Sequence, residues 1–166
     1  MKAQVIYLNQ EGYDEYLKSI NDLSRQLKRN SAVKGNSYEV AIGDGWHDNF
    51  DFEDAKRQEL NIISAIEAKK ALLEDIKIIP LRKINKDRID INDIVKLKLY
   101  FTENEPEEGW YKLTGKFYPQ ESKDYQEVTY NSPLGFALYN KQVGRTISYE
   151  TTQGNKIKVE ILAKEK

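Results

Sequence analysis

The chain has 166 residues, a formal net charge of −1, 32% charged residues and no cysteine. This length allows one full domain or two small ones, and the lack of cysteine excludes disulfides, thiolate metal sites and a thiol nucleophile. The near-neutral charge argues against bulk binding of nucleic acid. Without a signal peptide or a membrane-length apolar run, we expect a soluble, cytoplasmic protein with no membrane partner.

A first helical pattern begins near Asn9, a suitable N-cap, and runs to Arg29. Its apolar residues recur at steps of three and four, as Tyr13, Tyr16, Leu17, Ile20, Leu23 and Leu27. The pattern then fails over residues 30–37, which include the breaker cluster Gly35-Asn36-Ser37. Whether the helix frays, kinks or resumes across these residues stays open.

A second helical pattern starts after Asp48 or Asn49, either of which can cap it, and runs to about Asp75. Its apolar heptad positions are Phe52, Ala55, Ile62, Ile66, Leu73 and Ile76. Glu59 and Lys69 occupy two weak steps of this stripe. Two such helices joined by a short loop are expected to form an antiparallel hairpin whose arm is on the order of 40 Å long.

After Pro80 the helical period is lost, and from Ile94 the apolar period becomes two, which is typical of half-buried strands. We expect strands over 94–101, 110–117, 126–130, 146–151 and 156–162, and a turn over 104–109. Ser132 and Pro133 are predicted to cap and start a short helix that ends near Tyr139.

The predicted fold class is therefore an α-helical antiparallel coiled-coil hairpin followed by an α+β domain with a twisted antiparallel sheet. The period changes between the two parts, which predicts the domain boundaries. We expect a hairpin over 1–77, a linker over 78–92 and a sheet domain over 93–166.

The stretch over residues 43–54 is the most acidic part of the chain. It holds the only histidine, one of two tryptophans, no Lys or Arg, and five carboxylates: Asp44, Asp48, Asp51, Glu53 and Asp54. It carries a charge of −5, which leaves +4 on the remaining chain. Because this charged loop joins two apolar-striped helices, we expect it to be the hairpin tip and the place where the chemistry occurs.

Three segments together resemble the Gre-type bacterial transcript cleavage factors. The family's tip motif, close to G-D-x-x-E-N-x-E-Y-x-x-A-[K/R], is similar to Gly43, Asp44, Asp48, Asn49, Asp51, Phe52, Ala55 and Lys56. Its Ser-Pro signature resembles Ser132, Pro133, Ala137, Leu138, Lys141, Val143 and Gly144, and its first helix resembles Leu8–Tyr13. The tip departs from the family in having one extra residue between its two acids, Asp48 in place of Glu, and Phe52 in place of Tyr.

The resemblance implies a transcription elongation factor that binds bacterial RNA polymerase and inserts its acidic tip into the secondary channel. The factor would stimulate cleavage of backtracked RNA at the nascent 3′ end while having no nuclease activity of its own. Asp44 and Asp48 would complete a Mg²⁺ site shared with the polymerase, so that no cofactor is expected in the isolated protein. The resemblance also implies an FKBP-like C-terminal domain, and we expect a monomer. The alternative is a non-catalytic inhibitor or regulator that uses the same hairpin.

Basic residues are expected to form a band behind the tip: Arg25, Lys28, Arg29, Lys34, Lys56 and Arg57. A loop centred near Trp46 would place Arg57 roughly opposite Gly35. The band fits a solvated helix face and contacts to RNA phosphates or the channel wall equally well. Trp46, Asn49 and Phe52 are expected to support the tip loop, and His47 has no assigned role.

Overall fold

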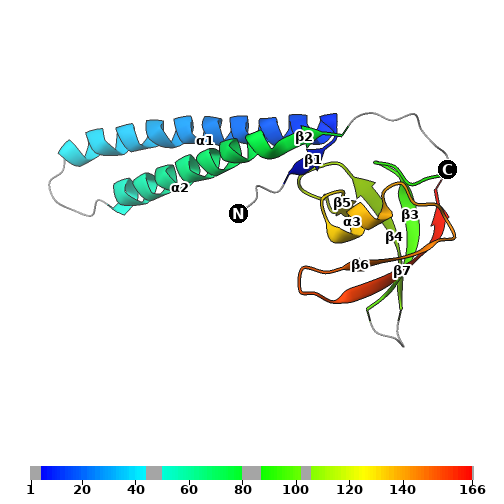
Figure 1. The fold of residues 1–166 in the computed structure, drawn as a ribbon. Helices are drawn as coiled ribbons and strands as arrows, with labels where there is room; N and C mark the ends of the chain where they lie inside the picture. The colour runs from blue at the N-terminus through cyan, green and yellow to red at the C-terminus, as the bar shows by residue number, and fades with distance from the viewer. Residues whose placement is uncertain (1–4, 44–49, 80–86, 102–105, 166) are drawn as a thin grey trace. The chain divides into compact units, whose positions relative to one another are not determined.

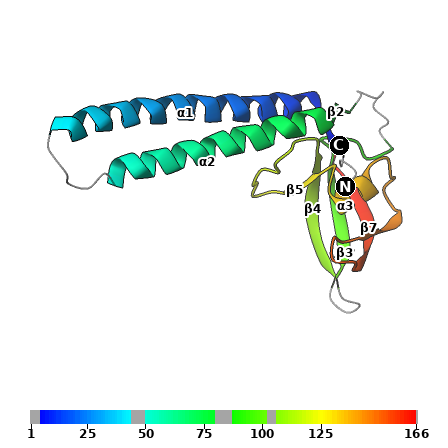
Figure 2. The same ribbon diagram turned by 60° about the vertical axis from the view of Figure 1, so that its left-hand side comes forward.

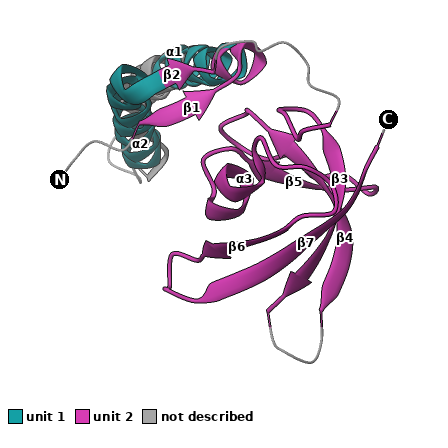
Figure 3. Ribbon diagram, turned by 45° about the vertical axis from the view of Figure 1, so that its right-hand side comes forward, with its two compact units in different colours: residues 1–3, 14–76 teal, residues 4–13, 77–166 magenta. Residues whose placement is uncertain are grey.

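The computed structural model describes residues 5–43, 50–79, 87–101 and 106–165, with side chains undescribed over 32–43 and 50–52. The chain forms two compact units, coloured separately in Figure 3. Residues 14–76, together with 1–3, form what we call the hairpin unit. Residues 4–13 and 77–166 form what we call the sheet unit.

Two long helices make up the hairpin unit, α1 (Gln10–Gly43, whose first turn belongs to the sheet unit) and α2 (Phe50–Leu72). They run side by side in opposite directions (Figures 1 and 2). The Tyr16 hydroxyl donates to the Lys69 carbonyl at 3.1 Å, and the Asn30 side-chain amide donates to the Ala55 carbonyl at 3.2 Å. The predicted helical N-terminal region is therefore confirmed.

The first helix is longer than its apolar pattern predicts. Instead of ending near Arg29, α1 continues without interruption through residues 30–37 to Gly43. The question that the sequence left open is thus answered by a continuous helix, in which Asn30 and Ser31 donate hydrogen bonds to groups on α2. Gly35 disfavours helix by about 1 kcal/mol relative to Ala, which packing against a partner helix can offset.

The second helix is shorter than predicted, and a small sheet follows it. After α2 the chain forms a 3₁₀ turn, η1 (Leu73–Asp75), and then β2 (Ile76–Ile78), so Ile76 is not helical. Strand β2 pairs with β1 (Ile6–Leu8), and the Ile79 N–H donates to the Leu8 carbonyl at 2.7 Å. Strands of three residues are too short to show a period, so the sequence pattern does not reveal them.

The sheet unit contains a curled five-stranded sheet in the order β5-β4-β3-β7-β6 (Figure 3). Its strands are β3 (Ile94–Tyr100), β4 (Glu107–Thr114), β5 (Gln126–Thr129), β6 (Thr146–Glu150) and β7 (Lys156–Lys164). The prediction of a wholly antiparallel sheet was wrong, because β4 and β5 are parallel. The connection over 115–125 returns the chain to the same end of the sheet, which a parallel pair requires.

Buried and half-buried residues alternate along the strands, and the buried ones form the core of the sheet unit. Val95, Leu97 and Leu99 of β3 are 2% exposed or less, whereas the residues between them are half-buried. Gly109 lies in β4 opposite Leu97, not in the predicted turn, and β4 therefore begins earlier than expected. Ile89, which falls within the predicted linker, is only 1% exposed and belongs to this core.

The predicted capped helix is confirmed as α3 (Pro133–Leu138). The Ser132 hydroxyl accepts a hydrogen bond from the Gly135 N–H at 3.0 Å, and Pro133 occupies the first helical position. Gly135 has no room for a side chain, since a Cβ would lie 2.0 Å from the Thr129 carbonyl oxygen. Ser132-Pro133 and Gly135 thus fix where the helix starts and how closely it approaches β5.

Within the sheet unit, the first turn of α1 packs against the end of β4. The Asn9 side chain caps the helix by accepting from the Gly12 N–H at 2.7 Å, as predicted, and the Asn9 N–H donates to the Gly115 carbonyl at 3.0 Å. A Cβ on Gly12 would lie 2.4 Å from that same carbonyl oxygen. Lys116, which is 8% exposed, pairs with Glu11 at 3.1 Å.

Candidate functional site

The predicted tip residues fall largely outside the described part of the chain. Asp44, Trp46, His47, Asp48 and Asn49 lie in the undescribed segment 44–49, so their roles stay predictions. Lys34 and Phe52 lie within α1 and α2, but their side chains are not described. Among the residues that the structure describes, no cluster of three or more His, Asp or Glu could hold a metal ion.

The start of α2 decides where three of the five acidic residues lie. Helix α1 ends at Gly43, and α2 begins at Phe50, close to the start that the sequence predicts after Asp48 or Asn49. Asp51, Glu53 and Asp54 therefore belong to the first turns of α2, where a carboxylate favours the positive end of the helix dipole. The other two acidic residues of this stretch, Asp44 and Asp48, lie outside the described residues.

Asp54 is held by its own helix. It forms an ion pair with Arg57 and accepts a hydrogen bond from the Gln58 amide at 2.7 Å. The hydrogen bond from Arg57, followed by that from Gln58, lowers the pKa of Asp54 below its ordinary value of 3.8. Asp54 thus has a structural role at the start of α2, as its position predicts.

The hairpin register differs from the predicted one. The bonds from Asn30 to Ala55 and from Ser31 to Glu59 place Arg57 level with residues near Asn30, not Gly35. The prediction was wrong because it assumed that the helices extend equally from the loop centre. In the observed register, α1 extends about two turns beyond the level at which α2 begins.

This register brings described basic side chains to one level of the hairpin. Lys28 and Arg29 on α1 lie level with Lys56 and Arg57 on α2, and all four are exposed, as is Arg25 one turn away. We call these five residues the basic band.

Two members of the basic band are partly neutralised. Arg25 pairs with Asp22 at 3.3 Å, and Arg57 pairs with Asp54. Lys28, Arg29 and Lys56 make no ion pair with another described residue. Such exposed cations can bind phosphate oxygens without reading a base sequence.

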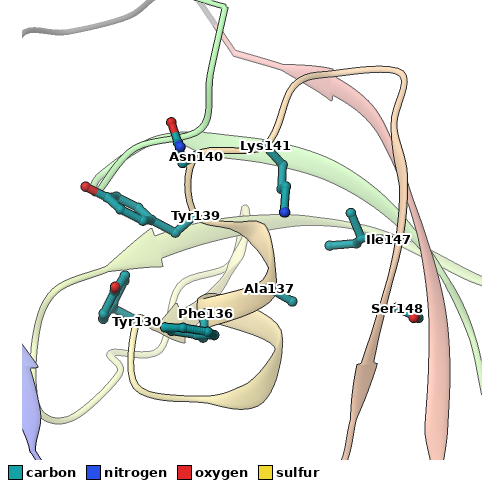
Figure 4. A pocket seen from close by; sticks show the side chains of 8 residues that line it. All are labelled: Tyr130, Phe136, Ala137, Tyr139, Asn140, Lys141, Ile147 and Ser148. Atoms are coloured by element: carbon teal, nitrogen blue, oxygen red, sulfur yellow. The ribbon is translucent and has the colours of Figure 1, made fainter.

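The sheet unit carries a second candidate surface, a cleft of about 690 Å³ between α3 and β6 (Figure 4). Tyr130 lines this cleft and makes edge-to-face contacts with Phe136 and Tyr139 at centroid distances of 6.0 and 5.0 Å. Ile147 and Lys141 also line the cleft. The Phe136 side chain is 68% exposed, which is unusual for a residue of its size and apolarity.

The aromatic cleft was not anticipated from the sequence. No role was predicted for Tyr130 or Phe136, and Tyr139 was named only as the end of the short helix. A signal was nevertheless present, because Tyr130, Phe136 and Tyr139 flank the Ser132-Pro133 signature at short spacing. A short helix that starts at a fixed cap brings such neighbours onto one surface.

Comparison with known proteins identifies relatives along most of the chain. The family model described as "Transcription elongation factor, GreA/GreB, C-term" matches residues 84–166. Transcription elongation factor GreA of Caldanaerobacter subterraneus subsp. tengcongensis is 31% identical over 148 residues, which cover 89% of this chain and 85% of that protein. GreA of Thermosipho melanesiensis is 24% identical over 155 residues, covering 93% of each chain.

Solved structures give a weaker similarity. The crystal structure of GreA factor homolog 1 (Gfh1) of Thermus thermophilus is 18% identical and has a TM-score of 0.42, with coverage of 98% of this chain and 100% of that chain. Gfh1 of Thermus aquaticus is 20% identical with a TM-score of 0.41, covering 99% of this chain and 100% of that one. Separately, none of the helices in the described ranges has the length and apolarity needed to cross a membrane.

Proposed function

Because the chain belongs to the GreA/GreB family of transcription elongation factors, we propose that it binds bacterial RNA polymerase and stimulates cleavage of backtracked RNA. The observation that carries the proposal is 31% identity to a GreA factor over 89% of the chain. The protein acts as a factor and not as a nuclease, since the polymerase itself cuts the RNA. This proposal also places it in the cytoplasm as a monomer, with a coiled-coil arm and an FKBP-like sheet unit.

The hairpin supports this proposal by its length. A helix of 34 residues is about 50 Å long, so α1 can carry a loop far from its own base. A slender pair of helices can enter a channel that a globular domain cannot. We propose that the hairpin enters the secondary channel of the polymerase and brings residues 44–49 toward the RNA 3′ end.

Asp44 and Asp48 are the proposed functional carboxylates. Mg²⁺ prefers oxygen ligands in near-octahedral geometry and gives up its water reluctantly, so two loop carboxylates alone would hold it weakly. Carboxylates of the polymerase and an RNA phosphate would complete the ligand set in the complex. Asp44 and Asp48 would then help to position the ion and the attacking water, which is the chemistry that phosphodiester hydrolysis needs.

The basic band and the aromatic cleft supply contacts in this proposal. The band would bind RNA phosphates or the channel wall, with Lys28, Arg29 and Lys56 the members that lack an ion pair to another described residue. The cleft would bind the polymerase through the exposed ring of Phe136. Large exposed aromatic side chains are enriched where proteins bind one another.

The test is an RNA cleavage assay on a backtracked elongation complex, with the wild-type protein and with Asp44→Asn and Asp48→Asn. Each variant removes one charge while keeping the shape of the side chain. We expect each change to abolish stimulated cleavage and to leave polymerase affinity within about twofold, because affinity comes from the arm and the sheet unit. Asp51→Asn is the matched control, since Asp51 lies in α2 and should retain cleavage.

The alternative function, a non-catalytic inhibitor, gives a different pattern. It predicts that the wild-type protein binds the polymerase and reduces transcription but never cleaves backtracked RNA at any Mg²⁺ concentration. Either Asp→Asn change would then alter inhibition little. That result would overturn the catalytic proposal while leaving polymerase binding in place.

A further inference from the structure

The apolar stripe of each helix in the hairpin is interrupted by polar residues. On α1 the stripe continues from Leu23 and Leu27 to Asn30 at steps of four and three. On α2 the interruptions are Glu59 and Lys69. All three polar side chains are half-buried between the helices, whereas their neighbours in sequence are mostly exposed. Their presence on the packed side therefore needs a structural reason.

Each interruption makes contacts across the hairpin. The Asn30 amide donates to the Ala55 carbonyl at 3.2 Å, and the Ser31 hydroxyl donates to the Glu59 carboxylate at 3.2 Å. At the other end, the Tyr16 hydroxyl donates to the Lys69 carbonyl at 3.1 Å. The Lys69 ammonium lies 3.1 Å from the Ser19 hydroxyl and 4.9 Å from the Tyr16 ring centroid.

The apolar residues alone would permit a second register, displaced by seven residues. In the observed register Leu23 is level with Ile62, and after a seven-residue slip Ile20 would be level with Leu72 and Leu27 with Ala65. A seven-residue slip moves one helix along the other by about 10 Å. The displaced register would also centre the loop between Gly43 and Phe50, as a symmetric hairpin has it, so loop closure does not oppose it.

The polar residues distinguish between these registers. Ala55 has a small side chain and is 7% exposed, so the Asn30 amide can reach the backbone carbonyl beside it. In the displaced register Asn30 would face Ile62, whose branched side chain shields its carbonyl. An amide held between the helices without a partner disfavours that state on the order of 10- to 100-fold.

We infer that Asn30, with Tyr16, is a positioning residue that sets the register of the hairpin and thus where its far end lies. A single buried polar residue is a known means of fixing register in paired helices. The consequence for RNA cleavage rests on the proposed function, because it assumes that residues 44–49 must be placed accurately. The register itself is a property of the protein alone.

Distances between spin labels on the full-length protein test the register directly. The chain has no cysteine, so pairs of introduced cysteines can be labelled selectively. The exposed positions Lys18 and Glu67 are level in the observed register, whereas Arg25 and Glu67 become level only after a seven-residue slip. We expect the Lys18–Glu67 pair to give one short distance and the Arg25–Glu67 pair one longer distance in an otherwise wild-type chain.

Asn30→Leu, alone and combined with Tyr16→Phe, should introduce a second population. In that population the Lys18–Glu67 distance is the longer one and the Arg25–Glu67 distance is the short one. Removing the amide weakens the bias by roughly tenfold, so the second population should approach a tenth or more in the double variant. The thermal midpoint should not fall with Asn30→Leu, because leucine continues the apolar stripe. A merely structural role for Asn30 predicts the reverse, a lower midpoint with unchanged distances.

Ser24→Ala is the matched control, since the Ser24 hydroxyl donates only within α1, to the Ile20 carbonyl at 2.9 Å. It should leave both distances unchanged, and Asn30→Gln, which keeps the amide donor, should restore the single population. Wild-type distances in the double variant would overturn the inference. Because no polymerase is present, that failure is separate from a negative result in the cleavage assay.

Discussion

The hairpin unit and the sheet unit are stabilised in different ways. The described core of the sheet unit is one contiguous cluster of eleven buried residues, which span from Ile89 to Ile161. In the hairpin unit the buried apolar residues lie in single file along two helices, as Tyr16, Ile20, Ala55, Ile62 and Ile66. Polar bonds such as that from Asn30 to Ala55 lie among them.

This difference shows how a protein can combine a rigid base with a register-dependent arm. A three-dimensional core admits one arrangement, because every side chain has neighbours on all sides. A single file of contacts repeats every seven residues, so its apolar residues fit more than one register. The choice of one register in the hairpin therefore has to come from its polar residues.

The largest expected effect is on the cores themselves. Leu97→Ala, at a position that is 0% exposed, should lower the free energy of unfolding of the sheet unit by about 3–5 kcal/mol. Ile62→Ala in the hairpin should cost less, about 2 kcal/mol, because water and neighbouring side chains can fill the space beside a single file of contacts. Denaturant unfolding monitored by Trp110 fluorescence, in a Trp46→Phe background, reports on the sheet, and circular dichroism reports mainly on the helices.

Equal losses of unfolding free energy in Leu97→Ala and Ile62→Ala would contradict this difference between the two units. A common transition for fluorescence and circular dichroism in both variants would mean that the two units unfold as one. We expect instead that Leu97→Ala shifts the fluorescence transition first and leaves most of the helical signal.

Local sequence signals predicted the elements that depend on local interactions. The alternation after Ile94 identified β3, and the Ser132-Pro133 pair identified the start of α3. The parallel pairing of β4 with β5 could not be predicted, because it depends on the path of residues 115–125 and not on any period. The continuation of α1 past Arg29 stayed open in the sequence because Asn30 has its partner 25 residues away, on another helix.

An intermediate effect is expected where the first turn of α1 meets β4. Gly12→Ala adds a methyl group that would lie 2.4 Å from the Gly115 carbonyl oxygen and 2.8 Å from the Lys116 Cα. Alanine favours helix by about 1 kcal/mol, but overpacking against backbone opposes it by about 1–3 kcal/mol, so we expect a net loss of stability. Thermal unfolding of the full chain measures this loss.

Gly144→Ala is the matched control for that substitution. Gly144 has a φ of +82°, and a Cβ added there would meet no atom within 4 Å, so its substitution strains the backbone without a clash. A loss of about 1 kcal/mol is expected there. If Gly12→Ala were neutral, the packing of α1 against β4 would be looser than the structure shows.

The basic residues of the candidate site could be predicted from the sequence, but their arrangement across the two helices could not. The basic residues were identified from their spacing on one helix, since residues three and four apart share a helix face. Which residues of α2 lie level with them depends on the register, and the apolar stripes alone do not determine it. The roles of Asp44 and Asp48 stay predictions, because both lie outside the described residues.

The smallest expected effect concerns the charge of Arg57. Its guanidinium can pair either with Asp54 of its own helix or with a phosphate. The hydrogen bond from Arg57 lowers the pKa of Asp54, so Arg57→Ala should raise that pKa back toward 3.8. A depressed carboxylate pKa stabilises the fold above the unfolded-state pKa, and this stability is lost as pH falls through the folded-state value. The wild-type hairpin should therefore lose slightly more stability below about pH 4 than the Arg57→Ala variant does.

A carboxyl NMR titration of Asp54 measures this shift directly, and Lys56→Ala is its control because Lys56 donates no hydrogen bond to Asp54. If Arg57→Ala leaves the titration unchanged, Arg57 is not committed to Asp54 in solution. Its guanidinium would then be as available to phosphates as Lys28, Arg29 and Lys56. The expected rise instead implies that binding RNA through Arg57 first requires breaking an exposed ion pair, which opposes binding only weakly.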